Sequence, residues 1–144
     1  MSVNPIPKGY HTITPYFSVR DAHGLVEFLK RAFDAVAEVH AMPDGSILNA
    51  QVQVGTSMVL IGQAPKDRPA EQLMPAMLYM YVEDVVTVYR KAIAAGAESI
   101  IEPRDQFYGD RVGAVKDLAG NQWWIATHKE EMSSEEMTRR AANR

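Results

Sequence analysis

The sequence predicts an α+β fold made of two βαβββ modules that form paired, curved, mixed sheets. Three observations support this prediction: a repeated order of strand-like and helix-like segments, matched residues in both repeats, and a proline-rich stretch between them. The length of 144 residues suits one domain better than two independent ones. We therefore expect a single domain over residues 1–144, with module 1 at about 11–63, a linker at 64–75, module 2 at about 76–128 and a C-terminal tail helix at 133–142.

The first module opens with a strand over Ile13–Val19, whose side chains alternate between two faces. The face expected to meet a helix carries Ile13, Phe17 and Val19, and the opposite face carries Thr14, Tyr16 and Ser18. A helix near residues 22–33 follows, because Asp21 stands at an N-cap position and apolar residues recur after it with helical spacing. Three more strands are expected at Val36–Met42, Ile47–Val54 and Ser57–Ile61.

The strand over Ile47–Val54 has two chemically different faces. Its apolar residues, expected to face the helix, are Leu48, Ala50 and Val52. Its polar residues, expected on the opposite face, are Asn49, Gln51 and Gln53. This polar face has two interpretations, a solvated strand surface or a set of ligand contacts.

The second module repeats the order of the first. A strand over Met77–Val82 leads to Asp84 as a helix cap and to a helix near residues 85–95. Shorter strands are expected at Ser99–Ile101, Val112–Lys116 and Gln122–Thr127. By alternation, the face away from the helix carries Met77, Tyr79, Tyr81, Gln122 and Trp124. A polar tail helix begins after Ser133.

The repeat is visible in matched landmarks. Ser18–Asp21 corresponds to Tyr81–Asp84, a strand end that enters a helix cap 63 positions later. Gly55 corresponds to Gly120, each placed before the last strand of its module. The helix exits at residues 33–35 and 95–97 correspond in the same order, so the two modules are expected to share one topology.

Composition excludes several classes of function. The chain is 47% hydrophobic and 23% charged with a net charge of −3, which does not favour nucleic-acid binding. It contains no cysteine, so disulfides, thiol nucleophiles and cysteine-ligated zinc are excluded. No apolar run is long enough to span a membrane, and residues 1–10 do not resemble a signal peptide. We expect a cytoplasmic protein with no nucleic-acid or membrane partner.

Three motifs carry a family resemblance: Gln106–Arg111 (QFYGDR), Asp117–Asn121 (DLAGN) and Trp124–His128 (WIATH). Together with the element order, they resemble the glyoxalase/bleomycin-resistance/dioxygenase, or vicinal-oxygen-chelate, superfamily over about residues 11–140. The match is best to its PhnB-like group, in which the DLAGN loop usually reads DPFGN. The resemblance implies the glyoxalase/bleomycin-resistance fold and, commonly, a homodimer.

Metalloenzymes of this superfamily hold a divalent metal at four positions. In this sequence those positions fall on Thr14, Val59, Met77 and Trp124, with Val59 uncertain by one or two residues. None has the histidine or carboxylate side chain that such metals favour. The four histidines, His11, His23, His40 and His128, are interpreted as surface or strand-end residues. We therefore expect no metal and no cofactor, the alternative being zinc, nickel, manganese or iron bound by other ligands.

The expected ligand-binding residues combine aromatic walls with a few polar groups. They are Tyr16, Asn49, Gln51, Tyr79, Tyr108, Arg111 and Trp124. Two alternatives stand beside this interpretation: the aromatic residues plug the cavity, and Asp110 and Arg111 have a structural role in fixing their loop.

Three functions stay open at this point. The first is a metal-free small-molecule-binding protein of the resembled superfamily, which sequesters a partly aromatic ligand. The second is a divalent-metal-dependent lyase, isomerase or dioxygenase of the same superfamily. The third is a dimeric scaffold without a ligand. No catalytic residue is identified for the second function.

Overall fold

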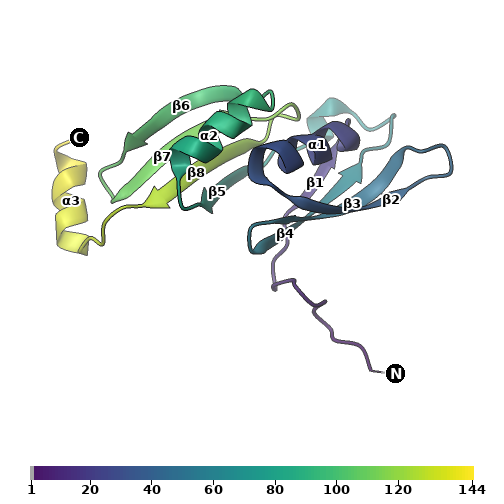
Figure 1. Cartoon of the computed structure of the whole chain (residues 1–144), viewed down its shortest axis with the longest axis horizontal. Helices are drawn as coiled ribbons and strands as arrows, with labels where there is room; N and C mark the ends of the chain where they lie inside the picture. Colours follow the sequence, from purple (N-terminus) through teal and green to yellow (C-terminus); the bar gives the residue numbers. More distant parts are fainter. Residues whose placement is uncertain (1) are drawn as a thin grey trace. The chain divides into compact units, whose positions relative to one another are not determined.

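The computed structural model describes residues 2–144 and contains two compact units, one ending at Ala76 and the other spanning Met77–Arg144. Each unit has the order strand, helix, strand, strand, strand, and a third α-helix follows at the C-terminus (Figure 1). Each sheet has four strands, with one parallel and two antiparallel pairs. The predicted α+β class with two βαβββ modules is therefore confirmed.

Unit 1 forms a sheet in the order β1-β4-β3-β2. Its elements are β1 (Tyr16–Val19), α1 (Ala22–Phe33), β2 (Val36–Ala41), β3 (Ile47–Val54) and β4 (Ser57–Gln63). Helix α1 packs on β2, β3 and β4, and its fully buried Leu25 and Leu29 belong to the same core as Val52 and Ile61. The opposite face of this sheet has no helix from unit 1.

The N-terminus of α1 is held from two directions. The Asp21 carboxylate accepts a hydrogen bond from the Gly24 amide at 2.8 Å, as an N-cap does. The Gln63 side chain, at the end of β4, accepts one from the Ala22 amide at 3.0 Å. Unit 2 has the equivalent hydrogen bond, because Thr127, in its last strand β8 (Gln122–His128), accepts one from the Val85 amide at 2.9 Å.

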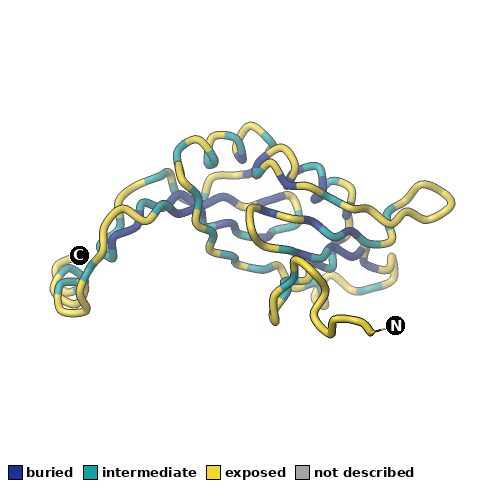
Figure 2. The backbone as a smooth tube through the Cα atoms, turned by 60° about the horizontal axis from the view of Figure 1, so that its bottom comes forward, coloured by how far each residue is buried: buried dark blue, intermediate teal, exposed yellow. Residues whose placement is uncertain are grey.

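Two details of unit 1 differ from the sequence expectation. Strand β1 begins at Tyr16, and Ile13 is 85% exposed, because Pro15 interrupts the chain with a residue that has no amide proton for the ladder. Leu48 is 54% exposed, although Ala50 on the same face is fully buried. The β2–β3 hairpin extends past the end of α1 (Figure 1), and residues 40–46 around its turn are exposed (Figure 2).

Unit 2 forms a sheet in the order β5-β8-β7-β6. Its elements are β5 (Met77–Tyr81), α2 (Val85–Ala94), β6 (Glu98–Asp105), β7 (Asp110–Lys116), β8 (Gln122–His128) and α3 (Ser134–Ala142). Helix α2 packs on β6, β7 and β8, and Asp84 caps its first turn. The linker contains a short 3-10 helix at Ala70–Gln72.

Strand β6 is longer than the expected Ser99–Ile101. It continues to Asp105 through Pro103, and its register with β7 shifts twice along the way. Proline is tolerated here because β6 lies at the edge of its sheet and the shifts remove the need for a regular ladder. No helix among residues 2–144 is both long and apolar enough to cross a membrane.

Candidate functional site

The helix-free face of the unit 2 sheet carries a group of large aromatic side chains. Strand alternation buries Trp123 and Ile125 toward α2 and leaves Trp124 on the opposite face. Tyr79 is the register partner of Trp124, so the two lie side by side on that face. Tyr79 is 44% exposed and Tyr81 is 63% exposed, and their ring centroids are 5.4 Å apart. This is a partly open aromatic surface.

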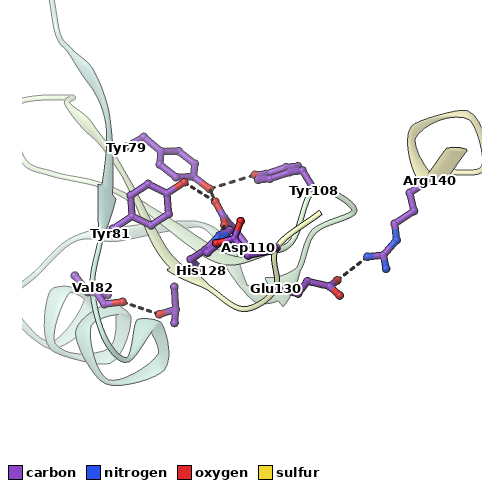
Figure 3. Close-up of polar contacts among 10 residues, drawn as sticks. Tyr79, Tyr81, Val82, Tyr108, Asp110, His128, Glu130 and Arg140 are labelled. Atoms are coloured by element: carbon purple, nitrogen blue, oxygen red, sulfur yellow. Dashed lines mark hydrogen bonds and ion pairs between the residues drawn. The ribbon is translucent and has the colours of Figure 1, made fainter. Parts of the chain in front are cut away.

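A buried carboxylate lies beside these rings. Asp110 is only 3% exposed, and its Oδ2 atom accepts hydrogen bonds from the Tyr79 hydroxyl at 2.6 Å and the Tyr81 hydroxyl at 2.9 Å. Its Oδ1 atom lies 2.8 Å from His128 Nδ1, and Tyr108 reaches the Tyr79 hydroxyl at 3.5 Å (Figure 3). We call these five residues the Asp110 cluster.

The cluster combines residues that are distant in sequence. Asp110 and His128 are register partners at the start of β7 and the end of β8, while the two tyrosines come from β5. Tyr108 comes from the turn before β7, where Gly109 has a φ of 100°. A Cβ at Gly109 would lie 2.6 Å from the Glu130 carbonyl oxygen, so only glycine fits that turn.

The hydrogen bonds fix the protonation of the cluster. Burial raises the pKa of the Asp110 carboxyl, but hydrogen bonds from Tyr79, His128 and Tyr81 outweigh it and leave that pKa below its ordinary value. The pKa of Tyr79 is raised, first by burial and then by its bond to Asp110. The pKa of Tyr81 is raised chiefly by its bond to Asp110. Asp110 is thus an anion and both phenols keep their protons.

His128 lies between two carboxylates. Its Nδ1 atom faces Asp110, and its Nε2 atom is 3.1 Å from the exposed Glu131 side chain. The hydrogen bond to Asp110, followed by that to Glu131, raises the pKa of the imidazole. The ring also meets Tyr81 edge to face at 6.4 Å between centroids. His128 therefore occupies the Oδ1 atom of Asp110, while the two tyrosines occupy its Oδ2 atom.

The cluster presents acceptors and aromatic rings to a ligand. The protons of Tyr79 and Tyr81 are committed to Asp110, which leaves the outer lone pairs of the phenolic oxygens as acceptors. A buried anion strengthens that acceptor character, because linked hydrogen bonds polarise one another. The arrangement suits a molecule with a ring and an N–H or O–H donor.

The positions at which the superfamily holds a metal do not fit one in this chain. Val59 is buried at 4% exposure and pairs with Val52 on the α1 side, so this position moves by one residue, within the one or two residues allowed for it. Its neighbour Leu60 pairs with Tyr16 as Trp124 pairs with Tyr79, and it is the true equivalent. Leucine and tryptophan supply no metal ligand, nor do Thr14 and Met77.

The carboxylates and histidines elsewhere in the described part of the chain do not form a metal site either. Within residues 2–144, no group of three or more histidine, cysteine, aspartate or glutamate side chains has a geometry that could hold a metal ion. Asp110, His128 and Glu131 bond to one another in a row, with the imidazole between the carboxylates, which is not a convergent ligand set.

The seven residues predicted to bind a ligand fall in three places. Tyr79, Tyr108 and Trp124 lie in or beside the Asp110 cluster, and the Trp124 indole donates to Gln122 at 3.1 Å. Tyr16 and Gln51 flank Leu60 in one register row of unit 1, and Asn49 belongs to the next row on the same helix-free face.

Arg111 lies elsewhere, and the expectation that it borders the same face as Trp124 is wrong. Arg111 follows Asp110 directly along β7, so its side chain is on the opposite face of the strand. Gly113 is on the same face as Arg111, and a Cβ added there would meet the Tyr89 ring of α2, so this is the face that α2 covers. Its Nε atom bonds to Asp105 at 2.8 Å, across the loop between β6 and β7, which supports the alternative of a structural role for Arg111 in that loop. Asp105 holds the pKa of the Arg111 guanidinium above its ordinary value.

Two central residues were missed by sequence reasoning. His128 was interpreted as a surface or strand-end histidine, and Asp110 only as a structural residue of its loop. Strand alternation could have indicated them, because it puts the His128 side chain on the same face as that of Trp124, and Asp110 begins the neighbouring strand. What sequence could not supply was the register that makes Asp110 and His128 direct neighbours.

Comparison with known proteins gives a family for this arrangement. The sequence model described as Glyoxalase/Bleomycin resistance protein/Dioxygenase superfamily matches residues 9–125. Uncharacterized protein Mb0911c of Mycobacterium bovis is 29% identical over 147 residues, which cover 95% of this chain and 93% of that protein. Uncharacterized protein Rv0887c of Mycobacterium tuberculosis is 29% identical over the same length, with 95% and 84% covered.

Solved structures show the same fold. TioX from Micromonospora sp. ML1 superposes with a TM-score of 0.69 at 23% identity, over 82% of this chain and 98% of that one. Protein PA1353 from Pseudomonas aeruginosa gives a TM-score of 0.67 at 14% identity, over 83% and 99%. The product of an Arabidopsis thaliana gene gives 0.62 at 20% identity, over 81% and 98%.

Proposed function

Because the chain belongs to the glyoxalase/bleomycin resistance protein/dioxygenase superfamily, we propose that it binds a small, partly aromatic molecule without a metal. The ligand lies on the helix-free face of the unit 2 sheet, against Tyr79, Tyr81 and Trp124. One observation carries this proposal: the rings of Tyr79 and Tyr81 are exposed, while their hydroxyl groups both donate their protons to the buried Asp110.

The cost of building such a cluster supports a binding role. A carboxylate buried at 3% exposure needs strong hydrogen bonds to offset its loss of hydration, and three side chains supply them here. The two tyrosines nonetheless keep about half of their surface exposed. A purely structural network would bury its rings, whereas a recognition surface leaves them open to a partner.

The chemistry of the face selects among ligands. Flat rings stack on Trp124 and meet the tyrosines, and a donor group on the ligand bonds to a phenolic oxygen. An anionic group at the same place would be repelled by Asp110, the nearest formal charge to both phenols. Neutral or cationic aromatic donors are therefore the proposed ligand class.

Three finer assignments belong to the same proposal. The QFYGDR motif at Gln106–Arg111 supports a place in the PhnB-like group. A homodimer is proposed because each sheet ends in strands that are paired on one side only within their sheet. A cytoplasmic location is proposed from the sequence alone. Light scattering tests the dimer, and cell fractionation tests the location.

The ligand site is tested by calorimetric titration with indole, which combines a flat ring with one N–H donor. We expect Tyr79→Phe and Trp124→Ala each to weaken binding several-fold. Tyr89→Phe is the matched control, because its hydroxyl bonds to Ser99 at 2.6 Å outside the site and is exposed. Equal affinities in all three variants and the wild type would refute the proposed site.

The metal-free part is tested separately by elemental analysis of protein purified without chelators. We expect less than one equivalent of zinc, nickel, manganese and iron combined. One full equivalent that is lost on Asp110→Asn or His128→Gln would instead support the metal-dependent enzymes of this superfamily.

A further inference from the structure

The helix-free face of unit 1 contains a position without a side chain between two polar ones. Ser18, Gly62 and Asn49 are neighbours in one register row across β1, β4 and β3. Adjacent strands are about 4.8 Å apart, so Ser18 and Asn49 flank Gly62 closely on both sides. Phe17 and Val19 are buried toward α1, which places Ser18 on the helix-free face.

The Tyr16 hydroxyl lies directly over Gly62. A Cβ atom added to Gly62 would collide with the Tyr16 hydroxyl oxygen and would come within 2.9 Å of Cζ. Tyr16 is 62% exposed as a whole, and its hydroxyl has a proton that it can donate to a ligand. The absence of a side chain at Gly62 is what allows the phenol to lie there.

A guanidinium reaches the same place from the linker. Arg68 Nη1 donates to Ser18 Oγ at 3.2 Å, in a half-buried position. Arg20 braces the linker that carries it, donating to the Arg68 carbonyl oxygen at 2.5 Å and to the Lys66 carbonyl oxygen at 3.5 Å. Arg20 thus holds the backbone of the linker, and the linker holds the Arg68 guanidinium at Ser18, beside Gly62.

That charge has no counterion among residues 2–144. The carboxylates of that segment form no ion pair with Arg68, and Arg20 bonds only to carbonyl oxygens. Around Gly62 the available groups are the Arg68 guanidinium, the Tyr16 hydroxyl and the Asn49 amide, which are all able to donate. Glu38, in the next row, lies three strands from Tyr16.

We propose that unit 1 carries a second ligand site, for a carboxylate or phosphate group of an organic molecule, at Gly62. Arg68 supplies the charge and a planar set of N–H donors, which match the oxygens of such anions. Tyr16 and Asn49 donate from the sides, and the Tyr16 ring lies against the organic part of the molecule. Its preference for an anion is opposite to that of the face proposed for unit 2, which repels anions.

Benzoate, phenyl phosphate and neutral benzamide are the probes, titrated into the full chain by isotope-edited NMR. We expect one or both anions to shift the amide signals of Gly62 and Ser18, with benzamide binding at least about tenfold more weakly. A preference between carboxylate and phosphate identifies the source of the anion. Equal binding of benzamide and the anions would refute the site.

Arg68→Gln tests the charge, and Arg31→Gln is its matched control. Both remove one guanidinium from unit 1, but Arg31 is exposed on α1, on the other face of the sheet. We expect benzoate or phenyl phosphate to bind at least about tenfold more weakly to Arg68→Gln, and unchanged to Arg31→Gln. An equal change in the two variants, at unchanged melting temperatures, would mean that only net charge matters and would overturn the proposal.

Discussion

The two modules share one fold and differ in the chemistry of their helix-free faces. Tyr16 and Tyr79 occupy equivalent register positions, paired with Leu60 and Trp124. Two residues further along each first strand, Ser18 takes the place of Tyr81. The pairing of β3 with β4 ends at Asn49 and Gly62, and the residues two positions beyond them, Ile47 and Ala64, correspond in sequence to Asp110 and His128 of unit 2.

The comparison shows that the fold does not itself create the site. Unit 1 has the same strand order and helix cover, yet three of the five cluster positions hold residues that cannot bond to one another. Because a buried carboxylate without partners is costly, Asp110 is tolerated only where Tyr79, Tyr81 and His128 occur together. The polar residues of unit 1 instead lie around Gly62 and include the Arg68 cation. The helix-free face of unit 1 is therefore expected to prefer anionic ligands, and that of unit 2 neutral or cationic ones.

The modules also differ in the hairpin that leads into their last strand. In unit 1, Val54 pairs with Ser57 across the two-residue turn Gly55–Thr56, where glycine provides the positive φ of 57°. In unit 2, the longer loop after Lys116 is held by Asp117, which is 5% exposed. Its carboxylate accepts hydrogen bonds from the amides of Ala119 and Asn121, the Asn121 side chain and the Trp123 indole.

The largest effect is expected from Asp117→Ala. It removes five hydrogen bonds that four donor groups make to a buried carboxylate, including the 2.8 Å bond from the buried Trp123 indole, and should lower the free energy of unfolding by about 3–5 kcal/mol. The measurement is urea unfolding followed by far-ultraviolet circular dichroism, which reports the helices and strands of both units. Thr56→Ala, in the hairpin of unit 1, is the control and should cost less than about 0.5 kcal/mol. Similar losses in both variants would contradict this difference.

The second prediction compares equivalent tyrosines. Tyr79→Phe removes a 2.6 Å hydrogen bond to the buried Asp110 and should cost about 1 kcal/mol, after allowance for the partial exposure of Tyr79. Tyr16→Phe removes the hydroxyl of a side chain that is 62% exposed and should cost less than about 0.5 kcal/mol. Thermal unfolding by circular dichroism measures both, and a reversed order would mean that the cluster adds no stability to unit 2.

Most of the fold was predictable because it depends on local patterns. Alternation in β3 and β8, helical spacing after Asp21 and the caps at Asp21 and Asp84 are visible in neighbouring residues. The errors lie where one residue overrides the pattern. Pro15 delays β1, and the shifts around Pro103 let β6 continue beyond the predicted end.

The site was predictable only in part, for the same reason. Alternation correctly put Tyr79 and Trp124 on one face, because parity is a property of a single strand. The meeting of Asp110 with Tyr79 and His128 depends on pairings among three strands, which one sequence does not specify. Arg111 was misplaced because the turn and the strand start were off by two residues, so its parity was not considered.

A smaller effect is expected in the pH dependence of unit 2. Asp110 and Glu131 raise the pKa of His128 above 6.5 in the folded protein. The protonated imidazole therefore contributes fully to the free energy of unfolding below pH 6.5, and this contribution is lost as the pH rises through the pKa that His128 has in the folded protein. The melting temperature of His128→Gln should therefore fall below that of the wild type more at about pH 5.5 than at about pH 8.5. His23→Gln, on α1, is the control. A gap that widens with rising pH would reverse the sign and contradict the assignment.

The smallest effect on stability is expected from Gly62→Ala, which gives unit 1 the residue that unit 2 has at the equivalent Ala126. The new Cβ displaces the Tyr16 hydroxyl, but this is the far end of an exposed side chain that can rotate away at little cost. Alanine also restricts the unfolded chain more than glycine, which offsets part of the strain. The free energy of unfolding should change by less than about 0.5 kcal/mol.

Binding to the same variant should change far more than its stability. The methyl group occupies the place over Gly62 and separates Tyr16 from Arg68, so benzoate or phenyl phosphate should bind at least about tenfold more weakly. Indole, which is proposed to bind to unit 2, should be unaffected by this substitution. The two titrations therefore separate the faces within one variant. Loss of both ligands together, with an unchanged melting curve, would show that they share a single site and would end the distinction between the modules.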